Sequence, residues 1–118
     1  MHQPTIYHNP RCSKSRATLE LLRERGFEPI VVPYLDTPPS AAEIDRLLDL
    51  LGVDPRGILR REESEYAELG LDDAHLTRAQ LVAAIAAHPR LLQRPIVVAG
   101  DKAAIGRPPE AVLAILPA

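Results

Sequence analysis

Short apolar runs and helical repeats alternate along the chain in an order that predicts an α/β fold. Brief runs of β-branched and apolar residues are typical of buried strands, and apolar positions that recur every three or four residues are typical of amphipathic helices. The strands are expected at residues 5–8, within 28–34, at 96–99 and at 102–105. The helices are expected at residues 13–25, 40–52, 54–60, 64–69 and 77–89, with a last one that begins at residue 109.

The order of these elements predicts a mixed four-stranded sheet with helices on its faces. The first strand, the first helix and the second strand form a unit whose right-handed crossover makes the two strands parallel. Gly100-Asp101 is a two-residue hairpin turn, so the last two strands should pair antiparallel. The helices at about 40–90 form an inserted lobe between the second and third strands. This order resembles the thioredoxin-like arrangement, and we expect one domain over residues 1–118.

Polar residues at the helix starts indicate where three of the helices begin. Ser40 with Glu43, and Thr77 with Gln80, have the spacing of a capping box, in which each side chain bonds the other residue's backbone N–H. Ser13 is placed to supply the hydroxyl cap of the first helix. The first helix should therefore begin directly after the only cysteine.

Composition and charge narrow the range of functions. The 118 residues carry a formal net charge of −2, which argues against general nucleic-acid binding because that needs a strongly basic face. A single cysteine excludes a disulfide scaffold and fits a reducing compartment. No signal-peptide pattern is visible, and no apolar run approaches the length of a membrane span. We therefore expect a cytoplasmic protein with neither nucleic acid nor a membrane as a partner.

Cys12 stands where a strand passes through a short loop into a helix. The unpaired N–H groups and the positive dipole end of a helix start favour a thiolate, which is the nucleophilic form of cysteine. The same N–H groups bind tetrahedral oxyanions. A lone cysteine is more often an inert buried side chain, but this context favours the nucleophile. Ser15 and Thr18 replace the second cysteine of a dithiol motif and the arginine of a phosphatase-type loop.

Three arginines stand at the boundaries of the expected elements. Arg60 ends the helix at 54–60, while Arg94 and Arg107 each precede a proline. In a thioredoxin-like fold the loop before the third strand faces the cysteine loop, often with a cis-proline, and Pro95 is the candidate. Convergent guanidinium groups suit a tetrahedral oxyanion. The alternative is that these arginines are solvated or pair with carboxylates such as those of Glu62, Glu63 or Glu110. The acidic run at 62–65 is itself interpreted as a solvated edge.

The histidines offer one candidate for acid–base chemistry. His8 precedes the cysteine loop and either titrates there or has a core or capping role. His2, His75 and His88 lack the spacing of metal ligands, so no metal site is expected.

Several motifs together resemble the glutaredoxin-coupled arsenate reductase (ArsC) family, and most closely its short, YfgD-like members. The resemblance spans essentially the whole chain. The motifs are Tyr7-His8-Asn9-Pro10-x-Cys12-x-x-Ser15-Arg16, Tyr34-Leu35-x-Thr37-Pro38-Pro39, Leu59-Arg60, Arg94-Pro95-Ile96-Val97-Val98 and Arg107-Pro108.

This resemblance implies an oxidoreductase that converts arsenate to arsenite. It implies that Cys12 attacks arsenate and that His8 helps to ionise the thiol. Glutathione would be the co-substrate that reduces the adduct, and glutaredoxin would clear the resulting mixed disulfide, without any bound cofactor or metal. The residues implied to bind arsenate or a similar oxyanion are Ser15, Arg16, Arg60, Arg94 and Arg107.

Two other functions fit the same residues. A related branch of the fold contains Spx-like regulators that bind RNA polymerase and use a dithiol switch, and Ser15 counts against that switch but not against protein binding. The chain could also be a general monothiol protein that accepts glutathione without acting on any oxyanion.

Overall fold

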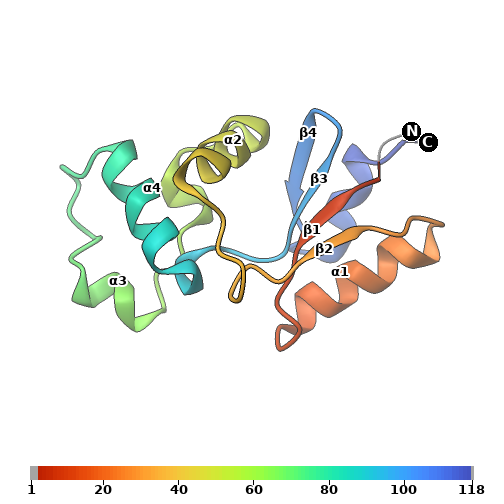
Figure 1. Ribbon diagram of the computed structural model, residues 1–118, viewed down its shortest axis with the longest axis horizontal. Coiled ribbons are helices and arrows are strands. Elements are labelled where there is room, and N and C mark those ends of the chain that lie inside the picture. Colours follow the sequence, from red (N-terminus) through yellow and green to blue (C-terminus); the bar gives the residue numbers. More distant parts are fainter. Residues whose placement is uncertain (1–2, 118) are drawn as a thin grey trace. The chain divides into compact units, whose positions relative to one another are not determined.

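The computed structural model describes residues 3–117, which fall into two compact units (Figure 1). The sheet unit combines the residues up to Thr37 with those from Arg94 onward, and the helical unit is Pro38–Gln93. Two cis peptide bonds, Arg94–Pro95 and Arg107–Pro108, lie in the sheet unit. His2, for which no metal role was expected, lies outside the described residues.

The sheet has four strands in the order β2-β1-β3-β4. β1 pairs parallel with β2 and antiparallel with β3, and β3 pairs antiparallel with β4. The predicted α/β fold with a mixed four-stranded sheet is therefore confirmed. The strands are β1 Thr5–Tyr7, β2 Ile30–Val32, β3 Ile96–Ala99 and β4 Lys102–Ile105.

Two helices pack against one face of the sheet. α1 spans Ser13–Glu24, and the 3-10 helix η3 spans Pro109–Ile115, where the sequence predicted a helix without specifying its type. The core between them is fully buried and consists of Ile6, Leu22, Val97 and Val112. Ile6 and Val97 are register partners on neighbouring strands, which places the α1–η3 layer over the middle of the sheet.

The helix α1 begins at Ser13, as predicted, but its N-cap residue differs from the prediction by one position. Cys12, with extended backbone angles, is the N-cap, and its side chain makes no capping hydrogen bond. Ser13 is the first helical residue, so the predicted Ser13 cap is wrong. An N-cap has non-helical angles while its carbonyl already accepts the first helical bond, and the Cys12 carbonyl accepts from the Arg16 N–H at 3.0 Å. The cysteine itself therefore occupies the helix terminus.

The helical unit contains the insertion expected between the second and third strands. Both predicted capping boxes, at Ser40 and at Thr77, are present. The helix expected to reach Arg60 instead ends at Ile58, because Leu59 forms an antiparallel bridge with Leu92. The elements of this unit are α2 Ala41–Leu51, η1 Pro55–Ile58, α3 Ser64–Glu68, α4 Arg78–Ala87 and η2 Pro89–Leu91.

Candidate active site

The loop that follows β1 and the loop that precedes β3 meet at the same end of the sheet. β1 ends at Tyr7, which is the register partner of Ile96, the first residue of β3. The cysteine loop therefore leaves the sheet where the cis-proline Pro95 enters it. The predicted cis bond before Pro95 is confirmed.

Cys12 is 8% exposed, and its sulfur lies at the N-terminus of the 12-residue helix α1. Its own N–H donates to the Asn9 carbonyl at 3.0 Å, which closes the loop. The first N–H groups of a helix have no partner within the helix and carry the positive end of its dipole. The sulfur is therefore held beside positive electrostatic potential.

Arg107 contacts the sulfur directly. Its Nη2 lies 3.6 Å from Cys12 Sγ, and its Nε donates to the Arg94 carbonyl at 2.8 Å. Because the second bond fixes one side of the planar guanidinium group, the other side is aimed at the thiol. Arg94, predicted as a side-chain ligand, holds this arrangement through its backbone carbonyl.

Gly106 allows the end of β4 to approach α1 closely. A Cβ atom at Gly106 would lie 2.5 Å from Thr18 Oγ1 and 2.7 Å from Pro95 Cγ. Its N–H also donates to the Pro95 carbonyl at 2.9 Å. The absence of a side chain thus brings Arg107 to the cysteine loop. Sequence reasoning missed this residue, and its position directly before Arg107-Pro108 was the available signal.

We expect Gly106→Ala to lower the free energy of unfolding by about 1–3 kcal/mol, as overpacking does, and to reduce activity by displacing Arg107. Urea unfolding measures the first effect. The Thr18→Ala change removes the nearest clashing atom, Oγ1, so the double variant should lose less stability than the sum of the two single variants. Strictly additive losses would show that the clash with Thr18 does not cause the loss of stability in Gly106→Ala.

His8 and Ser15 form a buried hydrogen-bonded pair beneath the loop. His8 Nδ1 lies 2.6 Å from Ser15 Oγ, which also accepts the Asn9 N–H at 3.0 Å. Burial, followed by the positive charges of Arg23 and Arg16, lowers the pKa of His8 from 6.5. Since a fully buried hydroxyl needs an acceptor, we assign Ser15 as the donor to Nδ1 of a neutral imidazole, with the ring proton on Nε2.

The lowered pKa of His8 predicts that stability is lost on mild acidification. Protons bind the unfolded chain more readily than the folded one, so this contribution is present above pH 6.5 and is lost as the pH falls below it. Urea midpoints measured at about pH 7.5 and 5.5 should fall more for the wild type than for His8→Gln. His75→Gln, at an exposed histidine, is the matched control and should behave like the wild type. An equal fall in His8→Gln would contradict the assignment.

Arg16 bonds back to the backbone of the cysteine loop. Its Nη1 donates to the Pro10 carbonyl at 2.8 Å. Arg16 and Ser15 were both expected to bind the oxyanion, and the structure shows each of them bonded to the loop backbone. These contacts hold the loop in shape around the thiol.

Arg60 belongs to the helical unit, where its guanidinium group pairs with two carboxylates. Its Nη2 lies 2.9 Å from Glu62 and its Nη1 lies 2.8 Å from Glu63. Glu63 also pairs with Arg90 at 3.1 Å and is only 14% exposed. The interpretation of the acidic run as a solvated edge is therefore wrong for Glu63. Within its unit Arg60 thus pairs with carboxylates, which was the alternative considered for these arginines.

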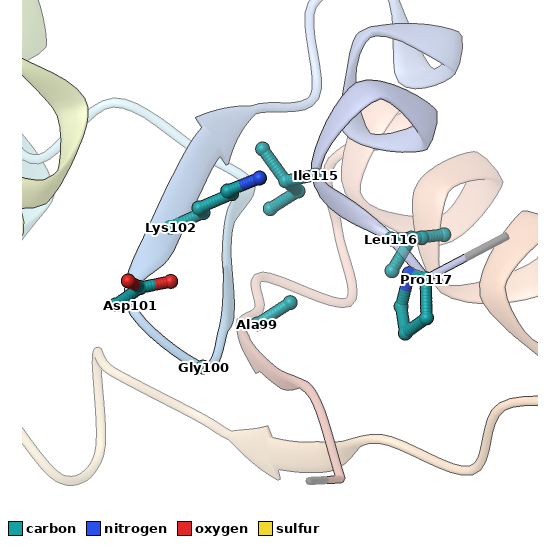
Figure 2. A pocket seen from close by; sticks show the side chains of 7 residues that line it. All are labelled: Ala99, Gly100, Asp101, Lys102, Ile115, Leu116 and Pro117. Carbon is teal, nitrogen blue, oxygen red and sulfur yellow. The ribbon is translucent and has the colours of Figure 1, made fainter. Parts of the chain in front are cut away.

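A hollow of about 330 Å³ lies at the tip of the β3–β4 hairpin (Figure 2). Ala99, Asp101 and Lys102 line one side of it, and Ile115 to Pro117 line the other. The register pairs Val98 with Thr5, the first residue of β1, so the hairpin tip lies at the end of the sheet opposite to the cysteine loop. The hollow is therefore separate from the thiol site.

Residues 3–117 contain neither a cluster of metal ligands nor a membrane-spanning helix. No group of three or more His, Cys, Asp or Glu side chains in this part of the chain could hold a metal ion. None of the described helices is long and apolar enough to span a membrane.

Comparison with known proteins gives close matches over nearly the full length. A model of the ArsC family matches residues 7–115. An uncharacterised protein of Escherichia coli (strain K12), YfgD, is 54% identical over 97% of this chain and 97% of its own length. An arsenate reductase of Neisseria meningitidis is 52% identical over 98% of this chain and 100% of its own length. The solved arsenate reductase from Vibrio cholerae has a TM-score of 0.94 at 51% identity, and the match covers 96% of this chain and 97% of that one. The predicted thioredoxin-like fold and the family resemblance are confirmed.

Proposed function

Because the chain belongs to the ArsC family, we propose that it is an oxidoreductase that converts arsenate to arsenite, with Cys12 as the nucleophile. Relatives named arsenate reductase, similar over nearly the whole chain, support the substrate. The observation that carries the mechanism is the 3.6 Å contact between Arg107 Nη2 and Cys12 Sγ at a helix N-terminus. A thiolate and a cationic site for an oxyanion then coincide.

In the first step the Cys12 thiolate attacks the arsenic atom of arsenate. A sulfur–arsenic bond forms, and an arsenic–oxygen bond breaks as hydroxide leaves with its electron pair, so arsenic remains pentavalent. Arg107 and the N–H groups of the first turn of α1 offset the negative charge of the attacked oxyanion. Arg94 is proposed to add guanidinium charge, while Ser15 and Arg16 keep the loop in position.

In the second step a glutathione thiolate attacks the Cys12 sulfur. The sulfur–arsenic bond breaks and its electron pair stays on arsenic, which becomes trivalent and leaves as arsenite. Cys12 is left in a mixed disulfide with glutathione. The chain has one cysteine, so an external thiol, here glutaredoxin, must remove the glutathione and restore the thiolate. This requirement for reduced thiols supports a cytoplasmic location.

A coupled assay tests the proposal. The protein is mixed with glutathione, glutaredoxin, glutathione reductase and NADPH, and NADPH oxidation is followed as arsenate is added. We expect a saturable, arsenate-dependent rate and one arsenite formed for each NADPH consumed. If oxidation is independent of arsenate while the thiol is intact, the proposal is wrong.

A further inference from the structure

A cavity of about 380 Å³ opens beside the cysteine loop, at the carboxyl ends of the parallel strands β1 and β2. The residues that follow β1, from His8 to Arg11, form one wall. The turn that follows β2, with Pro33, Leu35 and Asp36, forms the other. Ligands of open α/β sheets bind at the carboxyl ends of the strands, and small-molecule sites have volumes of about 300–1,000 Å³.

The two walls carry opposite charges on fixed backbone. Arg11 and Asp36 are both exposed, so both can meet a ligand. The Asn9 side chain accepts the Arg11 N–H at 3.0 Å, which fixes the first wall. The Pro33 carbonyl accepts the Asp36 N–H at 2.9 Å, which fixes the second wall. Leu35, which is 40% exposed, adds an apolar surface to the cavity.

The cavity is within reach of the nucleophile. Arg11 directly precedes Cys12, and adjacent Cα atoms are separated by about 3.8 Å. A small peptide that occupies the cavity can therefore place a central sulfur atom near Cys12. The required ligand has a thiol between two charged ends, one anionic and one that carries an ammonium group.

We propose that this cavity binds glutathione, with a carboxylate on Arg11 and the γ-glutamyl ammonium group on Asp36. The proposal rests on the proposed function for the choice of thiol. It assigns a recognition role to two residues that take no part in binding the oxyanion. Bound in this way, the tripeptide presents its sulfur to the Cys12 adduct.

Thiol–disulfide exchange tests the site without arsenate. The Cys12 thiolate attacks glutathione disulfide, one sulfur–sulfur bond forms as another breaks, and one glutathione thiolate leaves. The same reaction with bis(2-hydroxyethyl) disulfide, which is uncharged, reports the reactivity of the thiol alone. Mass spectrometry of the protein gives both rate constants, and their ratio measures recognition of the peptide.

We expect Arg11→Ala to lower this ratio about tenfold, the effect of losing one charge-assisted bond. Asp36→Ala should also lower it, because the ammonium contact is lost. Long-range electrostatics alone predicts a higher ratio for Asp36→Ala, since glutathione disulfide is anionic and the change removes a negative charge. Lys14→Ala, at an exposed cation in the first turn of α1, is the matched control and should change the ratio less than about twofold.

The inference is overturned if Arg11→Ala and Lys14→Ala lower the ratio equally, or if Asp36→Ala raises or does not change it. The rate with the uncharged disulfide also reports whether each variant retains a reactive, folded site. A protein that fails to reduce arsenate but shows the expected ratios would contradict the proposed function alone. Arsenate turnover with unchanged ratios would contradict only the glutathione site.

Discussion

Cys12→Ser is expected to lower arsenate-dependent turnover by more than about 10³-fold, because serine forms neither the sulfur–arsenic bond nor the mixed disulfide. The coupled assay measures this loss. The fold should survive the change, since Cys12 is the N-cap of α1 and its side chain makes no capping bond. Serine is a preferred N-cap residue and can accept a first-turn N–H, which offsets the loss of buried sulfur.

Cys12→Ala is the matched control for that variant. It lacks the thiol in the same way but cannot cap the helix, so it should be less stable than Cys12→Ser by about 0.5–2 kcal/mol. Both variants should be equally inactive. Residual turnover by either variant would show that another group performs the chemistry.

Arg107→Ala should lower kcat/KM for arsenate by about 10²–10³-fold, the usual effect of removing one donor to a developing oxyanion. The side chain is exposed and contacts the thiol and a backbone carbonyl, so stability should change little. Arg107→Lys should recover only part of the loss, since an ammonium group cannot bond the Arg94 carbonyl and face the sulfur with one planar group.

Arg25→Ala is the control for a general effect of charge. Arg25 is exposed at the far end of α1, and its removal changes the net charge equally. Its kcat/KM should stay within about twofold of the wild type, because exposed charges beyond a Debye length are screened. If Arg107→Ala behaves like Arg25→Ala, the guanidinium group at the sulfur has no role in the reaction.

The sequence predicted the elements well where local patterns decide the structure. The capping boxes at Ser40 and Thr77 and the hairpin turn at Gly100 depend on neighbouring residues, and all are found. The start of α1 was predicted correctly, but its N-cap was placed one residue late, because Ser13 has the stronger capping preference while the loop bond to Asn9 fixes Cys12 at the N-cap. A single hydrogen bond within a loop leaves no periodic pattern in the sequence from which the cap could be predicted.

The contacts within the site could not be predicted from local patterns. Arg107 and Cys12 are 95 positions apart, and what brings them together is the fit of Gly106 against Thr18 and Pro95. The local signal for this glycine was its position directly before Arg107-Pro108, which does not reveal the residues it packs against. The family motifs singled out Arg94 and Arg107 together, but only the structure shows that one holds the other through its carbonyl.

The most direct test measures how arsenate affects alkylation of Cys12 in the absence of any reducing thiol. The rate of reaction with iodoacetamide is followed by mass spectrometry as arsenate is added at constant ionic strength. A thiolate that attacks arsenate beside Arg107 predicts saturable protection that Arg107→Ala weakens. An alkylation rate that arsenate leaves unchanged would contradict the account.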